Sequence, residues 1–299
     1  MLKVLLLIVS VLLIVSLFVY ILTKKFASSD FSELKARVKL WWGMVAVFSA
    51  STLFNPYVSI VSLAFLCFFA LKEFFSLTRL RKNDRRIFIW AYLAIPIQFY
   101  WIFTGWYGMF IIFIPIYMFL FLPIVRIQSG GTKGFLKSVS STQWGLMLMV
   151  FGLSHLAYFQ KISSEDGAKL VLYLVLLTQL NDVIQYLISK TIGKRKVTPS
   201  ANPNITTEGF VIAFIITVGV GTLIGPFLTP MNITYSIFAG ILISVTGFIG
   251  NLNLTFVKRD LSLSDESKSI PPKESFLSRI DSLSYTAPLF FHFIRYFFF

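Results

Sequence analysis

Residues 209–228 read GFVIAFIITVGVGTLIGPFL, a stretch of 20 residues without one charged side chain. A helix needs about 20 mostly apolar residues to cross the hydrocarbon core of a bilayer. Similar stretches recur along the chain, so the sequence predicts an all-α, polytopic integral membrane protein with about 8–10 transmembrane helices. The candidate spans are residues 2–23, 41–54, 57–72, 88–103, 107–124, 143–160, 169–189, 209–228, 235–253 and 284–299.

The composition agrees with this fold class and excludes several others. Of the 299 residues, 56% are hydrophobic and 13% are charged, whereas a soluble domain carries about 25% charged residues. The 33 phenylalanines argue against a disordered chain. The single cysteine, Cys67, excludes an intramolecular disulfide and a CxxC redox motif, and two histidines far apart in the sequence disfavour a His-based zinc site.

The basic residues predict the orientation in the membrane. The formal net charge is +14, and 23 of the 27 Lys and Arg residues lie in alternate loops between the candidate spans. Cytoplasmic loops are the basic ones, so we expect these loops inside and the N-terminus outside. We attribute the positive net charge to these cytoplasmic loops and to their attraction to anionic membrane lipids. We expect no nucleic acid as a partner. The five loops are residues 24–40, 72–87, 125–142, 190–208 and 254–283.

The two halves of the chain differ in the polarity of their spans. Residues 1–140 hold few polar groups within the apolar stretches, and we interpret them as transmembrane scaffold helices. Residues 141–299 hold the polar motifs, and we expect both parts to form one membrane-embedded unit. The first stretch, residues 2–23, is longer than the core of a signal peptide and is interpreted as a retained anchor.

The first polar motif lies inside the candidate span 169–189. Asp182 and Tyr186 are four residues apart and therefore share one helical face. An acidic residue within a span is costly and indicates a functional site by default. The alternative is a structural aspartate near the interface that is hydrogen-bonded to a neighbouring helix.

The second motif leaves the membrane directly after this span. Lys194 belongs to a run of four basic residues, and Thr206 or Thr207 is expected to cap the next helix, close to Glu208. A helix N-terminus beside several lysines suits a polyphosphate. An ordinary basic cytoplasmic loop is the alternative interpretation.

The third motif covers residues 250–283 and mixes carboxylates with basic side chains. Such a mixture next to a bilayer suits a magnesium–phosphate reaction on a lipid headgroup, because Mg²⁺ takes one or two carboxylates plus phosphate oxygens. Lys and Arg offset the remaining phosphate charge. A solvated linker is the alternative. The charged residues are Lys258, Arg259, Asp260, Asp265, Glu266, Lys268, Lys273, Glu274, Arg279 and Asp281.

At these residues the chain resembles the phosphatidate cytidylyltransferases, also called CDP-diacylglycerol synthases. Two blocks carry the resemblance, and the spacing within each motif is kept. The first block is Asn181-Asp182, Tyr186, Gly193-Lys194, Pro199, Pro203, Thr206 and Glu208-Gly209. The second block is Gly250, Lys258-Arg259, Asp265, Pro271, Leu277 and Arg279-Ile280-Asp281-Ser282-Leu283.

The chain departs from the family pattern at two acidic positions that look like metal ligands in the family. They are occupied here by Asn251 and Ser278, and residues 271–275 replace a glycine–histidine loop. An amide or hydroxyl oxygen can touch Mg²⁺ but brings no negative charge. These departures leave Asp265 and Asp281 as the surviving acidic centres.

The resemblance implies the transfer of CMP from CTP to phosphatidate, which gives CDP-diacylglycerol and pyrophosphate in phospholipid biosynthesis. It also implies a Mg²⁺ cofactor, a homodimer and a place in the cytoplasmic (inner) membrane. The implied catalytic residues are Asp265, Asp281, Lys258 and Arg279, with Asp281 and Asp265 also as metal ligands. The implied substrate-binding residues are Asp182, Tyr186, Lys194, Thr206, Glu208 and Arg259.

Two other interpretations stay open. A family member that has lost catalysis would still bind a lipid headgroup or nucleotide, or would partner an active homologue. A transporter would need polar groups along a path through several spans. The polar residues instead gather toward one face of the membrane and the sequence has no internal repeat, which disfavours a transporter.

Overall fold

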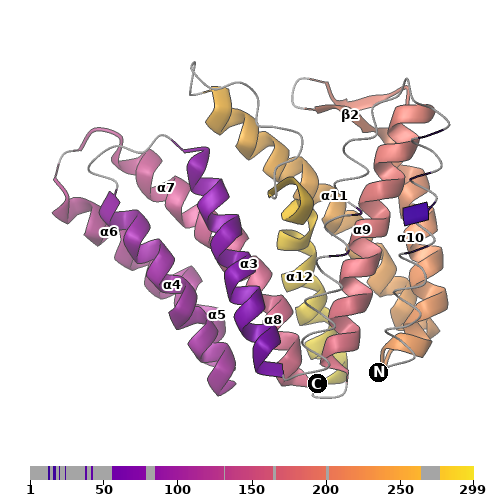
Figure 1. Ribbon diagram of the computed structural model, residues 1–299, viewed down its shortest axis with the longest axis horizontal. Coiled ribbons are helices and arrows are strands. Elements are labelled where there is room, and N and C mark those ends of the chain that lie inside the picture. Colours follow the sequence, from indigo (N-terminus) through magenta and orange to yellow (C-terminus); the bar gives the residue numbers. More distant parts are fainter. Residues whose placement is uncertain are drawn as a thin grey trace.

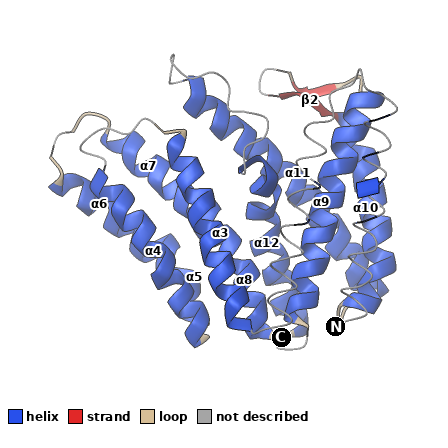
Figure 2. Ribbon diagram, in the orientation of Figure 1, coloured by secondary structure: helices blue, strands red, loops and turns tan. Residues whose placement is uncertain are grey.

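The computed structural model describes residues 56–78, 85–130, 132–163, 166–199, 202–263 and 277–299, with a few single residues before Pro56. The predicted spans 2–23 and 41–54 lie outside these ranges, as does Asp265. Within them the expected all-α architecture is confirmed (Figures 1 and 2). Seven helices of this part are long and apolar enough to cross a membrane.

The first half of the described chain forms one side of the bundle (Figure 1). The π-helical segment η2 contains Pro115, which has no N–H to donate to a regular α-helical ladder. The elements in order are α3 (Pro56–Ser76), α4 (Arg85–Thr104), α5 (Tyr107–Ile112), η2 (Phe113–Met118), α6 (Phe119–Gln128), α7 (Phe135–Gly145), η3 (Leu146–Gly152) and α8 (Leu153–Ile162).

The second half forms the other side, and a short hairpin lies over one end of it (Figure 2). The two strands pair antiparallel, with Lys196 opposite Thr206 and Thr198 opposite Asn202. The elements are α9 (Gly167–Thr191), β1 (Lys196–Thr198), β2 (Asn202–Thr206), α10 (Thr207–Leu228), α11 (Ile233–Leu263) and α12 (Leu277–Phe298).

The eight predicted spans that fall within the described ranges each coincide with a helix or a continuous helical run. Three runs extend by seven residues or more beyond the predicted spans. The run around residues 143–160 begins at Phe135, α11 continues beyond residue 253 to Leu263, and α12 begins at Leu277 instead of residue 284. Each extension contains at least one charged side chain, so the apolar stretch that predicts the span ends before the helix does.

The packing brings α9, α10, α11 and α12 together, while α3 packs mainly on α4, α8 and η3. Large aromatic side chains fill the interior, among them the fully buried Phe74, Phe110, Phe159, Phe290 and Phe291. Apolar side chains also face outward, as Leu223 and Phe227 do with exposed fractions of 70% and 90%. An outward apolar surface fits a helix bundle surrounded by lipid.

Candidate functional site

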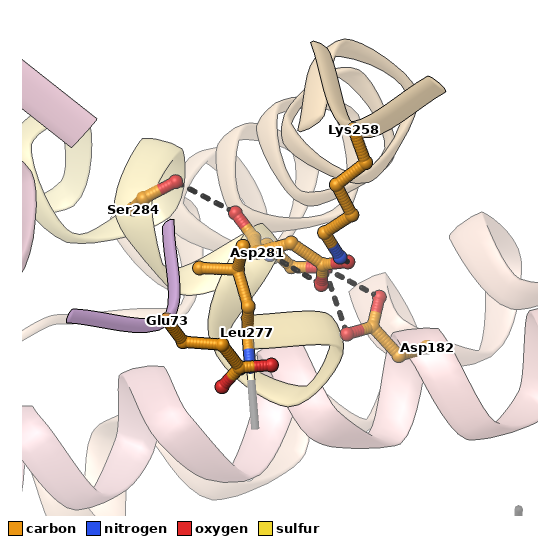
Figure 3. Close-up of polar contacts among 7 residues, drawn as sticks. Glu73, Asp182, Lys258, Leu277, Asp281 and Ser284 are labelled. Atoms are coloured by element: carbon orange, nitrogen blue, oxygen red, sulfur yellow. Dashed lines mark hydrogen bonds and ion pairs between the residues drawn. The ribbon is translucent and has the colours of Figure 1, made fainter. Parts of the chain in front are cut away.

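Two acidic side chains that are 99 residues apart in sequence meet through a serine between α9 and α12 (Figure 3). The Ser282 hydroxyl lies 2.9 Å from Asp182 Oδ1 and 2.8 Å from Asp182 Oδ2. The Ser282 backbone N–H donates to Asp281 Oδ1 over 2.9 Å. Asp182 and Asp281 are 3% and 4% exposed, so the site holds two buried carboxylates.

A lysine of α11 completes this group. Lys258 Nζ lies 3.5 Å from Asp281 Oδ2, and the two side chains are only 12% and 6% exposed. Three helices that are separate in sequence therefore each bring one charged side chain to the same place. The cation beside Asp281 offsets part of the cost of burying that carboxylate.

A glycine allows α11 and α12 to approach closely at this point. A Cβ atom on Gly250 would lie 2.9 Å from Tyr285 Cβ and 3.2 Å from the Asp281 carbonyl oxygen. A larger residue would push the two helices apart, because contacts this short are repulsive. The glycine of the second motif block thus sets the spacing beside Asp281.

The neighbour of Asp182 orients α9 from its other side. Asn181 Oδ1 accepts hydrogen bonds from Ser244 of α11 over 2.7 Å and from Thr217 of α10 over 3.3 Å. Asn181 is 1% exposed. Because these bonds fix the rotation of α9, they direct the next residue, Asp182, toward α12.

The hairpin after α9 is held by side chains of the first motif block. Both carboxylate oxygens of Glu208 accept from the Arg195 backbone N–H, over 3.2 and 3.1 Å, and Oε2 also accepts from the Lys194 N–H over 3.2 Å. Thr206 Oγ1 accepts from the Gly209 N–H over 3.1 Å and donates to Ser189 Oγ over 2.9 Å. Thr206 is therefore the expected helix cap, and both side chains shape the basic loop.

The structure brings together only part of the predicted site residues. Asp182, Lys258 and Asp281 converge, whereas Lys194, Thr206 and Glu208 belong to the hairpin. The Tyr186 ring contacts Lys190, whose Nζ lies 5.7 Å from the ring centroid. Arg259 is exposed on α11. The backbone of Arg279 lies in the first turn of α12, and Asp265 lies outside the described residues.

Sequence reasoning missed two residues of this region. Ser282 belongs to the second motif block but has no role that the sequence predicts, although its hydroxyl joins α12 to Asp182. Glu73, at the end of α3, accepts a hydrogen bond from the Leu277 backbone N–H over 3.0 Å (Figure 3). No signal in the sequence indicates Glu73, because it stands at the end of an apolar span 204 residues from its partner.

The side chains of this group suit a metal ion that is also bound by a substrate. They suit less well a metal site made of protein ligands alone. No group of three or more His, Cys, Asp or Glu side chains that could hold a metal ion occurs within the described ranges. Mg²⁺ needs only one or two carboxylates when phosphate oxygens supply the rest. Asp281, which pairs with Lys258, and Asp182 are both buried and meet that requirement.

Comparisons with known proteins point to one family. A model of the cytidylyltransferase family matches residues 35–297. The chain is 38% identical over 267 residues to the uncharacterized protein YnbB of Escherichia coli strain K12, covering 88% of each chain. It is 28% identical over 158 residues to the phosphatidate cytidylyltransferase of Staphylococcus haemolyticus strain JCSC1435, covering 50% of this chain and 61% of that protein.

A further phosphatidate cytidylyltransferase, from Staphylococcus aureus strain COL, is 26% identical over 193 residues. That match covers 61% of this chain and 74% of the relative. The family match spans most of the chain, and it includes both blocks that carry the resemblance. The chain therefore belongs to the cytidylyltransferase family.

Proposed function

We propose that this protein is a phosphatidate cytidylyltransferase, which transfers CMP from CTP to phosphatidate and releases pyrophosphate. The observation that carries the proposal is the buried group of Asp182, Asp281 and Lys258. Its members come from the two motif blocks and from three helices, and Asp182 lies in the second half of α9, the helix that leads into the basic hairpin.

The reaction is a displacement at the α-phosphorus of CTP. A phosphate oxygen of phosphatidate forms the new P–O bond, the bond from the α-phosphorus to the bridging oxygen breaks, and pyrophosphate leaves with that oxygen. An anion attacks an anion, so catalysis depends on positioning and on charge neutralisation. Lys258 would meet the phosphates, and the hairpin with Lys194 would hold the polyphosphate near the membrane surface.

Magnesium fits this proposal as a cofactor that the substrate helps to hold. Asp281 and Asp182 would hold the ion within the described region, with Asp265 as a further candidate ligand. When bound, Mg²⁺ supplies positive charge to the phosphate oxygens during the transfer. The Ser282 hydroxyl and Lys258 keep the two carboxylates in place, since each bonds or pairs with one of them.

The proposed reaction also fixes an orientation. CTP is a cytosolic nucleotide, so the site and the basic loops would face the cytoplasm and the N-terminus would lie outside. The alternation of basic loops supports this orientation, and the family resemblance implies the cytoplasmic (inner) membrane. The product would be CDP-diacylglycerol, which stays in the same leaflet as its lipid precursor.

An assay on the purified protein in lipid–detergent micelles tests the proposal. With CTP, phosphatidate and Mg²⁺, the wild type should form CDP-diacylglycerol, and omission of Mg²⁺ should abolish it. Asp281→Asn should lose activity, whereas Asp260→Asn, which changes an exposed carboxylate of α11, should not. Failure of the wild type, while a known family enzyme works in the same micelles, would refute the proposal.

The substitutions at Asn251 and Ser278 favour a second candidate function, a family member that binds lipid headgroup or nucleotide without catalysis. The double variant Asn251→Asp with Ser278→Asp separates the two functions. Activity that appears only in the double variant would mean that the fold is kept and the metal ligands have been lost. Activity in the wild type would mean that the remaining carboxylates suffice.

A further inference from the structure

A polar contact joins the end of α3 to the first residue of α12 (Figure 3). Glu73 Oε2 accepts a hydrogen bond from the Leu277 backbone N–H over 3.0 Å, and Leu277 is fully buried. The two helices touch each other directly only here and there: α3 packs mainly on α4, α8 and η3, and α12 chiefly on α11, although α12 also packs on α8 and η3. The contact therefore links two helices that share neighbours but have little direct contact with each other.

A carboxylate is well suited to the start of a helix. The first N–H groups of a helix have no partner within it, and the helix dipole favours a negative charge at this end. A hydrogen bond to an ionised acceptor is also stronger than one between neutral groups. Glu73 thus provides the N-terminal anchor of α12 from a helix remote in sequence.

The position of α12 decides whether the candidate site forms. Asp281 and Ser282 follow Leu277 by four and five residues, about 6 to 7.5 Å along the helix axis. A slip of one residue would move each of them by about 1.5 Å and turn it by about 100°. Either change would break the bonds of Ser282 to Asp182 and of Asp281 to Lys258.

We propose that Glu73 is a positioning residue of the candidate site: its carboxylate fixes where α12 begins and thereby where Asp281 and Ser282 lie. The inference rests on the proposed function for its catalytic consequence and on geometry for the rest. The chain offers a matched control beside it. Lys72, exposed on the same turn of α3, lines with Glu73, Phe69 and Ser76 an open hollow of about 480 Å³.

The test compares Glu73→Ala, Glu73→Gln and Lys72→Gln in the full chain, reconstituted in lipid nanodiscs. Amide hydrogen exchange of the first two turns of α12 and the kcat and KM for CTP are measured for each. Glu73→Ala should raise the exchange and lower kcat by about 10- to 100-fold, as loss of a residue that orients metal ligands does, with little change in KM. Glu73→Gln keeps an acceptor oxygen, so the exchange of α12 should stay near that of the wild type and most of kcat should be kept. Lys72→Gln should match the wild type in both measurements.

Two results would overturn the inference. One is an unchanged exchange of α12 in Glu73→Ala. The other is a loss of kcat in Glu73→Gln as large as in Glu73→Ala with exchange like that of the wild type, since Glu73 would then act on the substrate itself. The exchange measurement needs no turnover. An inactive wild type would therefore refute the proposed function, while the exchange data would still test whether Glu73 anchors α12.

Discussion

The Ser282 hydroxyl is shared between the two carboxylate oxygens of Asp182, at 2.9 and 2.8 Å, although the residues are 100 positions apart. This contact places the acidic residue of α9 directly against the helix that carries Asp281. Ser282 is fully buried, so the bond lies away from water. Removing a partner of a buried polar group has a larger effect than an average hydrogen bond would suggest.

Replacing this serine should lower the stability of the protein. Ser282→Ala removes the donor to a buried carboxylate and should lower the free energy of unfolding by about 1 to 3 kcal/mol. Thermal unfolding in one fixed detergent measures the change. Ser284→Ala is the matched control, because the Ser284 hydroxyl donates to the Asp281 backbone carbonyl of its own helix over 2.7 Å. A Ser284 variant as damaged as the Ser282 variant would contradict a special role of the Asp182 contact.

The ion pair of Lys258 and Asp281 should show coupling in a double-mutant cycle. Breaking a buried pair by changing one partner costs about 3 to 5 kcal/mol, since the other charge stays buried. Lys258→Met and Asp281→Asn should therefore each destabilise strongly, while the double variant should be more stable than the sum of the two changes implies. Denaturant unfolding of the four proteins gives the coupling energy. Strict additivity would mean that the two side chains do not depend on each other.

The close approach of α11 to α12 should make position 250 intolerant of even one methyl group. Gly250→Ala places a Cβ 2.9 Å from Tyr285 Cβ and should cost about 1 to 3 kcal/mol of stability, because the helices must separate. Gly219→Ala is the control, since beyond the backbone of its own helix no atom lies within 4 Å of the added Cβ. It should be neutral or stabilising through the higher helix propensity of alanine. Equal melting temperatures for both variants would argue against tight packing at Gly250.

The clamp on the basic hairpin should be visible in proteolysis. Glu208→Ala removes the acceptor for the backbone N–H groups of Lys194 and Arg195, so trypsin should cleave at this loop several-fold faster than in the wild type. Glu208→Gln retains an acceptor oxygen and should be cleaved at an intermediate rate. Mass spectrometry of the fragments locates the cut. A cleavage rate unaffected by Glu208→Ala would show that other contacts hold the hairpin.

The fold was largely predictable because a bilayer imposes a simple rule on sequence. Twenty apolar residues such as 209–228 must form a helix whose backbone bonds are satisfied internally, and α10 covers that stretch. The helix ends were less predictable. Residues 254–263 continue α11 although they include the charged run Lys258, Arg259 and Asp260, because helical hydrogen bonding does not stop where the apolar stretch stops.

The sequence predicted a residue of the candidate site only where a charged side chain lies within an apolar span. Asp182 stood out because an acidic residue within a span demands a partner, but the partner, Ser282, is an ordinary serine whose role depends on the docking of α12 onto α9. Glu73 carries no local signal at all, since its function depends on a contact with Leu277 across the bundle. Helix packing in three dimensions, absent from any local pattern, decides both.

The fate of the two ends of the CTP triphosphate tests the proposed reaction most directly. Purified protein in micelles with phosphatidate and Mg²⁺ is given CTP labelled at the α-phosphate in one tube and at the γ-phosphate in the other. Transfer of CMP predicts that the α label enters the lipid fraction and that the γ label appears as pyrophosphate. In Asp281→Asn neither labelled product should form. A γ label in the lipid, or no label in the lipid from either nucleotide while a known family enzyme is active, would contradict it.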